Sequence, residues 1–96
     1  MILNERDTDE GLLVSVCDPD VLGETFEDGP VSLTVDEEFY DGEPVDENAV
    51  VDSLAKCAVA NLVGTETVEV AIEHGFVDEA NVLDIADTRH AQMLRM

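Results

Sequence analysis

Four side chains in this sequence have the chemistry of a nucleophile, a general base or a zinc ligand. They are two cysteines and two histidines: Cys17, Cys57, His74 and His90. Structural zinc sites usually bring their ligands in close pairs a few residues apart. These four residues are widely separated and form no such pair. The spacing therefore predicts two free, buried thiols, no metal site and no cofactor.

Cys17 and His90 are also the candidates for nucleophilic catalysis. Asp18 follows Cys17 directly, and His90 would act as its base only if the fold brought the two together. Sequence spacing does not show such an arrangement, and a core cysteine at the end of a strand is the simpler interpretation. A small enzyme using Cys17 or His90 in a pocket stays open as an alternative.

A second group is the basic and polar cluster near the carboxyl end of the sequence, formed by Arg89, His90, Gln92 and Arg95. The functional interpretation is a patch in which Arg89 and Arg95 contact an anion or an RNA backbone. The alternative is a strand whose cations offset neighbouring carboxylates locally, since surface ion pairs are common and weak. On a strand, His90 and Gln92 would point to one side and Arg95 to the other.

The charge of the chain is strongly acidic. It has 24 Asp and Glu against 4 Lys and Arg, which gives a net charge of −20. The carboxylates are spread along the sequence between apolar residues, which favours a folded domain with an acidic surface over a disordered tail. The carboxylates of an acidic surface repel one another, and proteins of halophiles carry such surfaces. At ~1 M salt the electrostatic screening length falls to about 3 Å, so most of this repulsion disappears. We therefore expect a cytoplasmic protein from a cell whose interior has a high salt concentration.

The helices and strands that the sequence predicts indicate one α+β domain over residues 1–96, and they must position the candidate residues. A strand hairpin over residues 2–6 and 11–17, a short turn after Asp18, and a strand at 31–35 come first. Helices are predicted over 46–63, starting at Asp46, and over 66–74, and strands over 82–86 and 90–96. We expect a small, mostly antiparallel sheet with a helical hairpin packed on one side.

The charge of the second predicted helix argues against DNA as a partner, and the lack of long apolar segments argues against a membrane. A recognition helix must present cations to DNA phosphates, whereas the second helix presents Glu66, Glu69 and Glu73. The segment MILNERDTDEG lacks the basic and apolar parts of a signal peptide, and no apolar run approaches the ~20 residues of a membrane span. We expect no DNA binding and no membrane association.

Short motifs along nearly the whole chain resemble an archaeal family of unknown function. They include Val16-Cys-Asp18, Phe39-Tyr-Asp-Gly-Glu43, Ala60-Asn-Leu-Val-Gly64 and His90-Ala-Gln92. The family is domain-of-unknown-function family 424, and the acidic surface resembles that of a haloarchaeal member. The resemblance implies a compact α+β domain with no established activity. It marks Cys17, Asp18, Asn61, His90 and Gln92 as the positions of interest.

Three functions follow as hypotheses. The first is a non-enzymatic accessory factor of translation that binds the ribosome, RNA or another protein, supported by the absence of catalytic motifs and by the cluster at Arg89–Arg95. The second is the small enzyme using Cys17 or His90. The third is a protein-interaction adaptor, which would require an exposed apolar patch.

Overall fold

The first two strands form the hairpin that their sequence predicts. The computed structural model describes residues 1–95, and in it β1 (Ile2–Thr8) pairs antiparallel with β2 (Gly11–Cys17). The register runs from Ile2 opposite Cys17 to Thr8 opposite Gly11. Gly11 has a φ of +114°, a conformation that L side chains rarely adopt, and it closes the turn.

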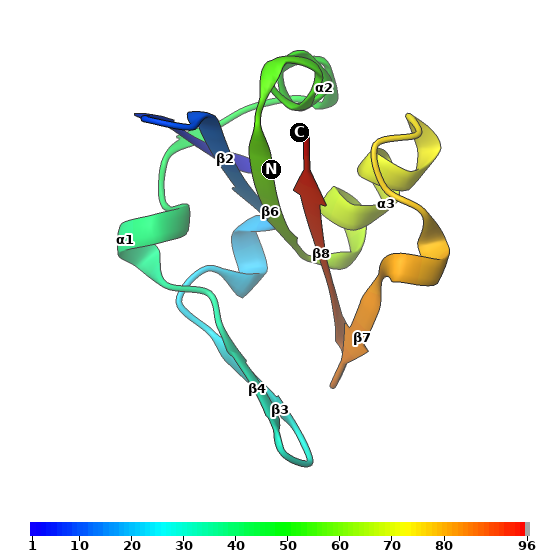
Figure 1. Cartoon of the computed structure of the whole chain (residues 1–96). Helices are drawn as coiled ribbons and strands as arrows, with labels where there is room; N and C mark the ends of the chain where they lie inside the picture. The colour runs from blue at the N-terminus through cyan, green and yellow to red at the C-terminus, as the bar shows by residue number, and fades with distance from the viewer. Residues whose placement is uncertain (96) are drawn as a thin grey trace.

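The described residues form one six-stranded mixed sheet in the order β5-β1-β2-β6-β8-β7 (Figure 1). The other strands of this sheet are β5 (Glu43–Pro44), β6 (Val59–Val63), β7 (Leu83–Ile85) and β8 (Thr88–Leu94). The β2 and β6 strands run parallel, and the remaining neighbours are antiparallel. The predicted α+β class with a mostly antiparallel sheet is confirmed.

The longer helices, α2 (Glu47–Lys56) and α3 (Thr65–Glu73), pack on one face of this sheet. Val50 and Leu54 of α2 and Val68 of α3 are fully buried against the sheet residues Val16 and Leu62. Burying such side chains is worth about 1.5–3 kcal/mol each. This layer is therefore the principal core.

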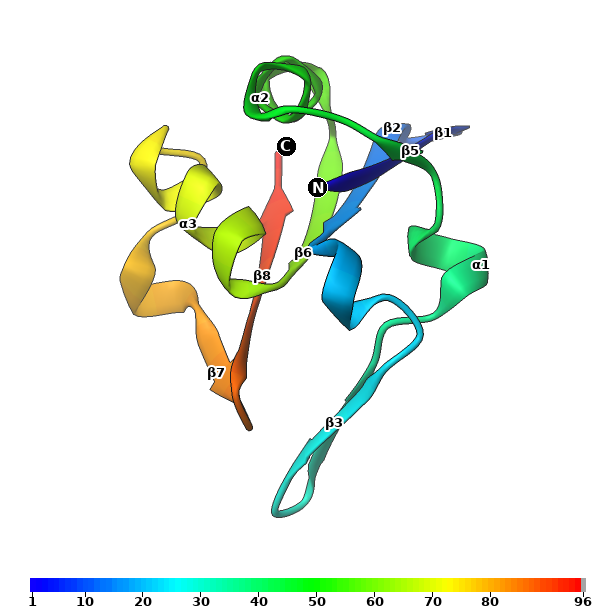
Figure 2. The ribbon, with the colours of Figure 1, turned by 180° about the vertical axis from the view of Figure 1, so that it is seen from behind.

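On the opposite face, Ile85 and Thr88 are buried beside the β7–β8 turn, and a second core covers Cys17 and Val63. There, α1 (Glu37–Tyr40) and the 3-10 turn η1 (Pro19–Val21) bury Val21 and Tyr40 against Cys17 and Val63. A hairpin of β3 (Thr25–Asp28) and β4 (Val31–Thr34) extends away from the sheet in both views (Figures 1 and 2). A second 3-10 turn, η2 (Glu79–Asn81), precedes β7.

The predicted helix over residues 46–63 is wrong in its second half. Asp46 caps α2 as expected and accepts a hydrogen bond from Ala49 N at 3.0 Å, but α2 ends at Lys56 and Val59–Val63 is the inner strand β6. Residues four apart share a face in a helix and also in a strand, so the apolar repeat that includes Leu62 fits both. The helices are consequently joined through β6 and not by a direct turn.

Two smaller differences concern the strands. The strand at residues 31–35 is β4, and its partner β3 was not predicted. The last two strands differ from the predicted ranges 82–86 and 90–96. β7 is shorter than predicted and β8 begins two residues earlier, at Thr88, because the turn between them lies at Ala86 and Asp87. The predicted end of the last strand at Met96 lies outside the described residues.

Candidate functional site: the open face of the sheet

Strand register aligns four polar side chains in one row across the sheet. Asn4 lies opposite Ser15, Ser15 opposite Asn61, and Asn61 opposite Gln92. Directly opposed residues point to the same face, and this is the face away from α2 and α3. Gln92 Nε2 donates to Asn61 Oδ1 at 2.8 Å, and Asn4 Nδ2 donates to the Asp41 carbonyl at 2.7 Å. Of these four side chains, Asn61 and Gln92 are joined directly to each other, Asn4 is bound outside the row, and Ser15 is buried.

On this face Val63 and Thr88 are buried, whereas the other residues of β6 and β8 are half-buried or exposed, and we call that part the open face. It consists of Val59, Asn61, His90, Gln92 and Leu94, which alternate along the strands with the buried residues of the core. In Figure 1, β6 and β8 lie in front of α3 without a helix covering them. Leu94 is 74% exposed, more than any other large apolar side chain in residues 1–95. The open face contains no carboxylate, although the chain carries 24.

His90 is held by its neighbour on β6. Its Nδ1 lies 2.9 Å from the Leu62 carbonyl oxygen. A carbonyl only accepts, so Nδ1 carries the hydrogen, and in the neutral ring Nε2 is left as an acceptor. Cys17 and His90 occupy the same row of the sheet, but Val63 of β6 stands between them. Two strand spacings separate their backbones by about 10 Å, so the fold does not assemble them as a nucleophile and base.

The Cys17 thiol lies in the core and is fully buried. Burial raises the pKa of Cys17 to about 11, and the neighbouring Asp18 carboxylate also raises it. Only the thiolate is nucleophilic, so this group is protonated and inert at neutral pH.

We therefore expect Cys17 to react with iodoacetamide at neutral pH roughly two to three orders of magnitude more slowly than a free thiol. The same thiol should react at the ordinary rate after unfolding in guanidinium chloride. Peptide mass spectrometry of both samples gives the two rates. Labelling of Cys17 in the native protein at a free-thiol rate would contradict this assignment and support the nucleophile hypothesis.

The predicted cationic cluster is divided between the two faces of β8. Arg89 lies on the helix side, where its Nε donates to Asp84 Oδ1 at 2.9 Å and its guanidinium is 3.4 Å from Glu79 Oε1. Arg95 donates to the carbonyl of Ala55 in α2 at 2.6 Å. His90 and Gln92 face the other way. The arginines therefore offset local groups and do not join the open face.

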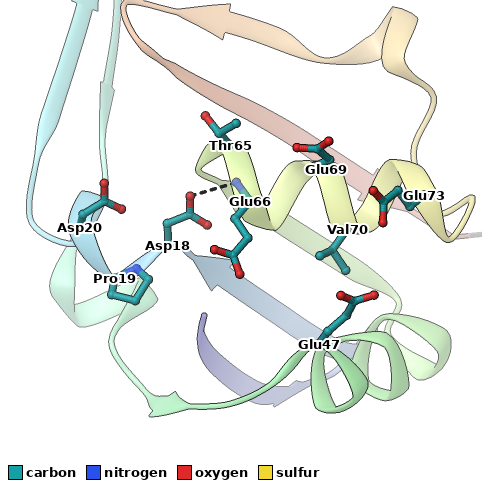
Figure 3. Close-up of a pocket in the computed structure, with 9 residues that line it drawn as sticks. All are labelled: Asp18, Pro19, Asp20, Glu47, Thr65, Glu66, Glu69, Val70 and Glu73. Atoms are coloured by element: carbon teal, nitrogen blue, oxygen red, sulfur yellow. Dashed lines mark hydrogen bonds between the residues drawn. The ribbon is translucent and has the colours of Figure 1, made fainter.

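Asp18 follows the last residue of β2 and binds the amino terminus of α3 (Figure 3). The residue is 8% exposed, and its carboxylate accepts hydrogen bonds from Glu66 N at 3.1 Å, Thr67 N at 2.9 Å and Thr67 Oγ1 at 2.7 Å. Asp18 also precedes the short turn η1, but η1 receives no side-chain hydrogen bond from it. The carboxylate instead caps α3, because Gly64 leaves the first N–H groups of that helix without a cap of their own.

A groove of about 480 Å³ lies between η1, α3 and the start of α2 (Figure 3). Most of the side chains that line it are carboxylates: Asp18, Asp20, Glu47, Glu66, Glu69 and Glu73. At its margin His74 Nε2 lies 2.8 Å from Glu47 Oε2. Like charges of this density repel phosphates. The molecule thus has a strongly acidic groove on the α3 side and an uncharged open face on the other side of the sheet.

Asn4 and Ser15 are the members of the polar row that sequence reasoning missed. Neither residue has a spacing in the sequence that connects it to Asn61 or Gln92. Only strand register connects them. Within residues 1–95, no three His, Cys, Asp or Glu side chains converge in a way that would hold a metal ion. No helix in that range is both long and apolar enough to cross a bilayer.

These features define a small α+β domain with a mixed sheet, the two longer helices on one face and an uncharged open face on the other. The model of the family described as a protein of unknown function, DUF424, matches residues 5–96, and the chain belongs to that family. Its fold is similar to the crystal structure of an uncharacterized conserved protein from Methanopyrus kandleri, at 20% identity and a TM-score of 0.78. The likeness covers 99% of this chain and 93% of that protein. Among curated proteins, none matches the sequence significantly.

Proposed function

We propose that this protein is a non-enzymatic accessory factor that binds a protein partner through the open face. The observation that carries the proposal is an accessible surface without carboxylates on a chain of net charge −20. The centres of protein interfaces are depleted of charge and combine apolar contacts with hydrogen bonds. Leu94 and Val59 supply the apolar part, and Gln92 and Asn61 supply amide donors and acceptors.

A protein surface suits this face better than RNA does. Phosphate contacts by Lys and Arg supply most non-specific affinity for nucleic acids. Here Arg89 is paired with Asp84 and Glu79, Arg95 binds a backbone carbonyl, and Lys56 lies 3.6 Å from Glu5. The open face also carries no Phe, Tyr or Trp ring on which RNA-binding sheets stack bases, and its one aromatic ring, the His90 imidazole, is half-buried and held to the Leu62 carbonyl. Of the partners suggested by the sequence, a protein of the ribosome is the first to test.

The setting we propose is the cytoplasm of a haloarchaeon. The support is the charge of −20, which destabilises a compact chain at low ionic strength and is screened at molar salt. Binding in that setting depends on apolar contact and hydrogen bonds more than on long-range attraction. This favours an uncharged docking face.

The substitution Asn61→Asp tests the proposal. Asp keeps the oxygen that accepts from Gln92 Nε2 and adds a carboxylate to the centre of the open face. Placing an unpaired charge in an interface disfavours binding, so we expect the affinity for the partner to fall about tenfold or more. The measurement is sedimentation with ribosomal subunits from the host at molar KCl. Cross-linking then identifies the contacted component as protein or RNA.

The matched control is Asn81→Asp, which adds the same charge at an exposed position away from the open face. It should sediment like the unmodified protein. Equal sedimentation of the two variants would show that the open face is not the docking surface. Cross-links to RNA alone would replace a protein partner with a nucleic-acid partner, and absence from all ribosomal fractions would remove the link to translation.

A further inference from the structure

Within residues 1–95, no strand pairs with the outer edge of β8 over its second half. Gly64 N donates to the Arg89 carbonyl at 2.9 Å, and Arg95 N donates to the Ala58 carbonyl at 2.8 Å, so the backbone groups of these residues face β6. Backbone groups alternate between the two edges of a strand. Those of Gln92 and Leu94 therefore point away from β6.

The strand β7 covers only the first half of that edge. It pairs with β8 from Thr88 to His90 and reaches no further, since Leu83 lies opposite His90. Within residues 1–95, no strand pairs with Gln92 or Leu94 on the outer side. An unpaired row of N–H and C=O groups is a template for another strand.

The other edge of the sheet, by contrast, is protected. The short strand β5 pairs with Ile2 and Leu3 of β1. Further along β1, Glu5 and Asp7 add charge, and the Arg6 guanidinium donates to the Glu38 carbonyl of α1. Charged side chains and covering segments are the usual means by which proteins block an edge strand. Residues 91–94 of β8 have no charged residue and no proline.

We propose that a second copy of this chain pairs with this edge, β8 antiparallel to β8, and joins two sheets into one. A twofold axis at Met93 places Gln92 of one copy opposite Leu94 of its partner, so the free N–H and C=O groups of both residues are satisfied. Their side chains stay on the open face. The two open faces would then form one continuous surface.

Charge favours this edge over other surfaces of the molecule for self-association. Two copies of net charge −20 repel each other, so a stable contact must bring their least acidic parts together. The acidic groove lies on the α3 side of the sheet, which in Figure 2 is in front of β8. Pairing along β8 adds no carboxylate to the strand-to-strand contact. The proposal concerns self-association and does not depend on the docking function proposed above.

The variant Leu94→Pro tests this pairing. Proline removes the outward N–H of residue 94 and leaves the hydrogen bonds to β6 in place, which is the arrangement in which edge strands tolerate proline. The matched control Leu94→Ala removes most of the side chain and keeps the N–H. Sedimentation equilibrium in molar KCl measures the dimer dissociation constant, which we expect on the order of 10–100 µM for a contact this small. Leu94→Pro should weaken dimerisation at least about tenfold relative to Leu94→Ala.

Hydrogen exchange on the unmodified protein gives an answer that does not depend on any variant. The amides of Gln92 and Leu94 should exchange slowly at millimolar protein and rapidly after dilution into the micromolar range. A monomer at millimolar concentration, or fast exchange of both amides at every concentration, would overturn the proposal. Equal dimerisation of the proline and alanine variants would also overturn it.

Discussion

Replacing Gly64 with alanine should destabilise the fold by about 3–5 kcal/mol. Gly64 has a φ of +116° and a ψ of +147°, a region of backbone space that is essentially restricted to glycine. A Cβ at this position would also lie 2.3 Å from Asp18 Cγ. Strain and overlap therefore act together at the start of α3. The measurement is guanidinium unfolding in molar KCl.

The control is Gly29→Ala in the turn between β3 and β4. Gly29 also has a positive φ, of +60°, but no atom lies within 4 Å of the position its Cβ would take. This substitution introduces backbone strain without overlap, and we expect a cost of about 1 kcal/mol. A Gly64→Ala variant no less stable than Gly29→Ala would contradict the close approach between Gly64 and Asp18.

Asp18→Ala should cost about 2–4 kcal/mol of unfolding free energy. It removes the side-chain cap of α3, worth about 0.5–2 kcal/mol, and leaves the buried Thr67 hydroxyl and amide without their partner. Asp18→Asn keeps an accepting oxygen but puts an NH₂ group near the Glu66 amide, so its cost should be intermediate. Guanidinium unfolding under the same conditions measures both variants.

Asp20→Ala is the matched control, because it removes the same charge from the same groove. Asp20 is exposed, and the expected change is within about 0.5 kcal/mol. Combining Asp18→Ala with Gly64→Ala removes the atoms that the new methyl group would overlap. The double variant should therefore be about 1–3 kcal/mol more stable than the sum of the single effects predicts. Strict additivity would show that Asp18 and Gly64 do not interact through contact.

Local patterns predicted several elements because few alternatives satisfy them. Alternating apolar residues on either side of a turn are enough to define the β1–β2 hairpin, and Asp46 before an apolar repeat is enough to begin α2. The end of α2 was not predictable in this way. Residues 59–63 are apolar at positions compatible with both helix and strand, and the choice is made by the neighbours β2 and β8, which surround β6 in the sheet.

In the candidate site, too, some features were predictable from the sequence and others depend on the tertiary structure. The family resemblance marked Asn61, His90 and Gln92, and the structure places all three on the open face. It also shows that Cys17 is in the core, that Asp18 caps a helix distant in sequence, and that Arg89 and Arg95 point to the helix side. Strand register sets these relations, and register depends on pairing partners far apart in the chain.

By itself, the sequence determined the acidic composition of the chain, the α+β class, the first hairpin and the start of the main helix. These follow from composition and from contacts between residues close in the chain. Only the tertiary structure decided that residues 59–63 form a central strand and that the row from Asn4 to Gln92 exists. It also decided that, within residues 1–95, no strand pairs with the outer edge of β8 at residues 91–94. Each of these depends on which distant segments pair, and a local pattern that fits two periodicities cannot specify that.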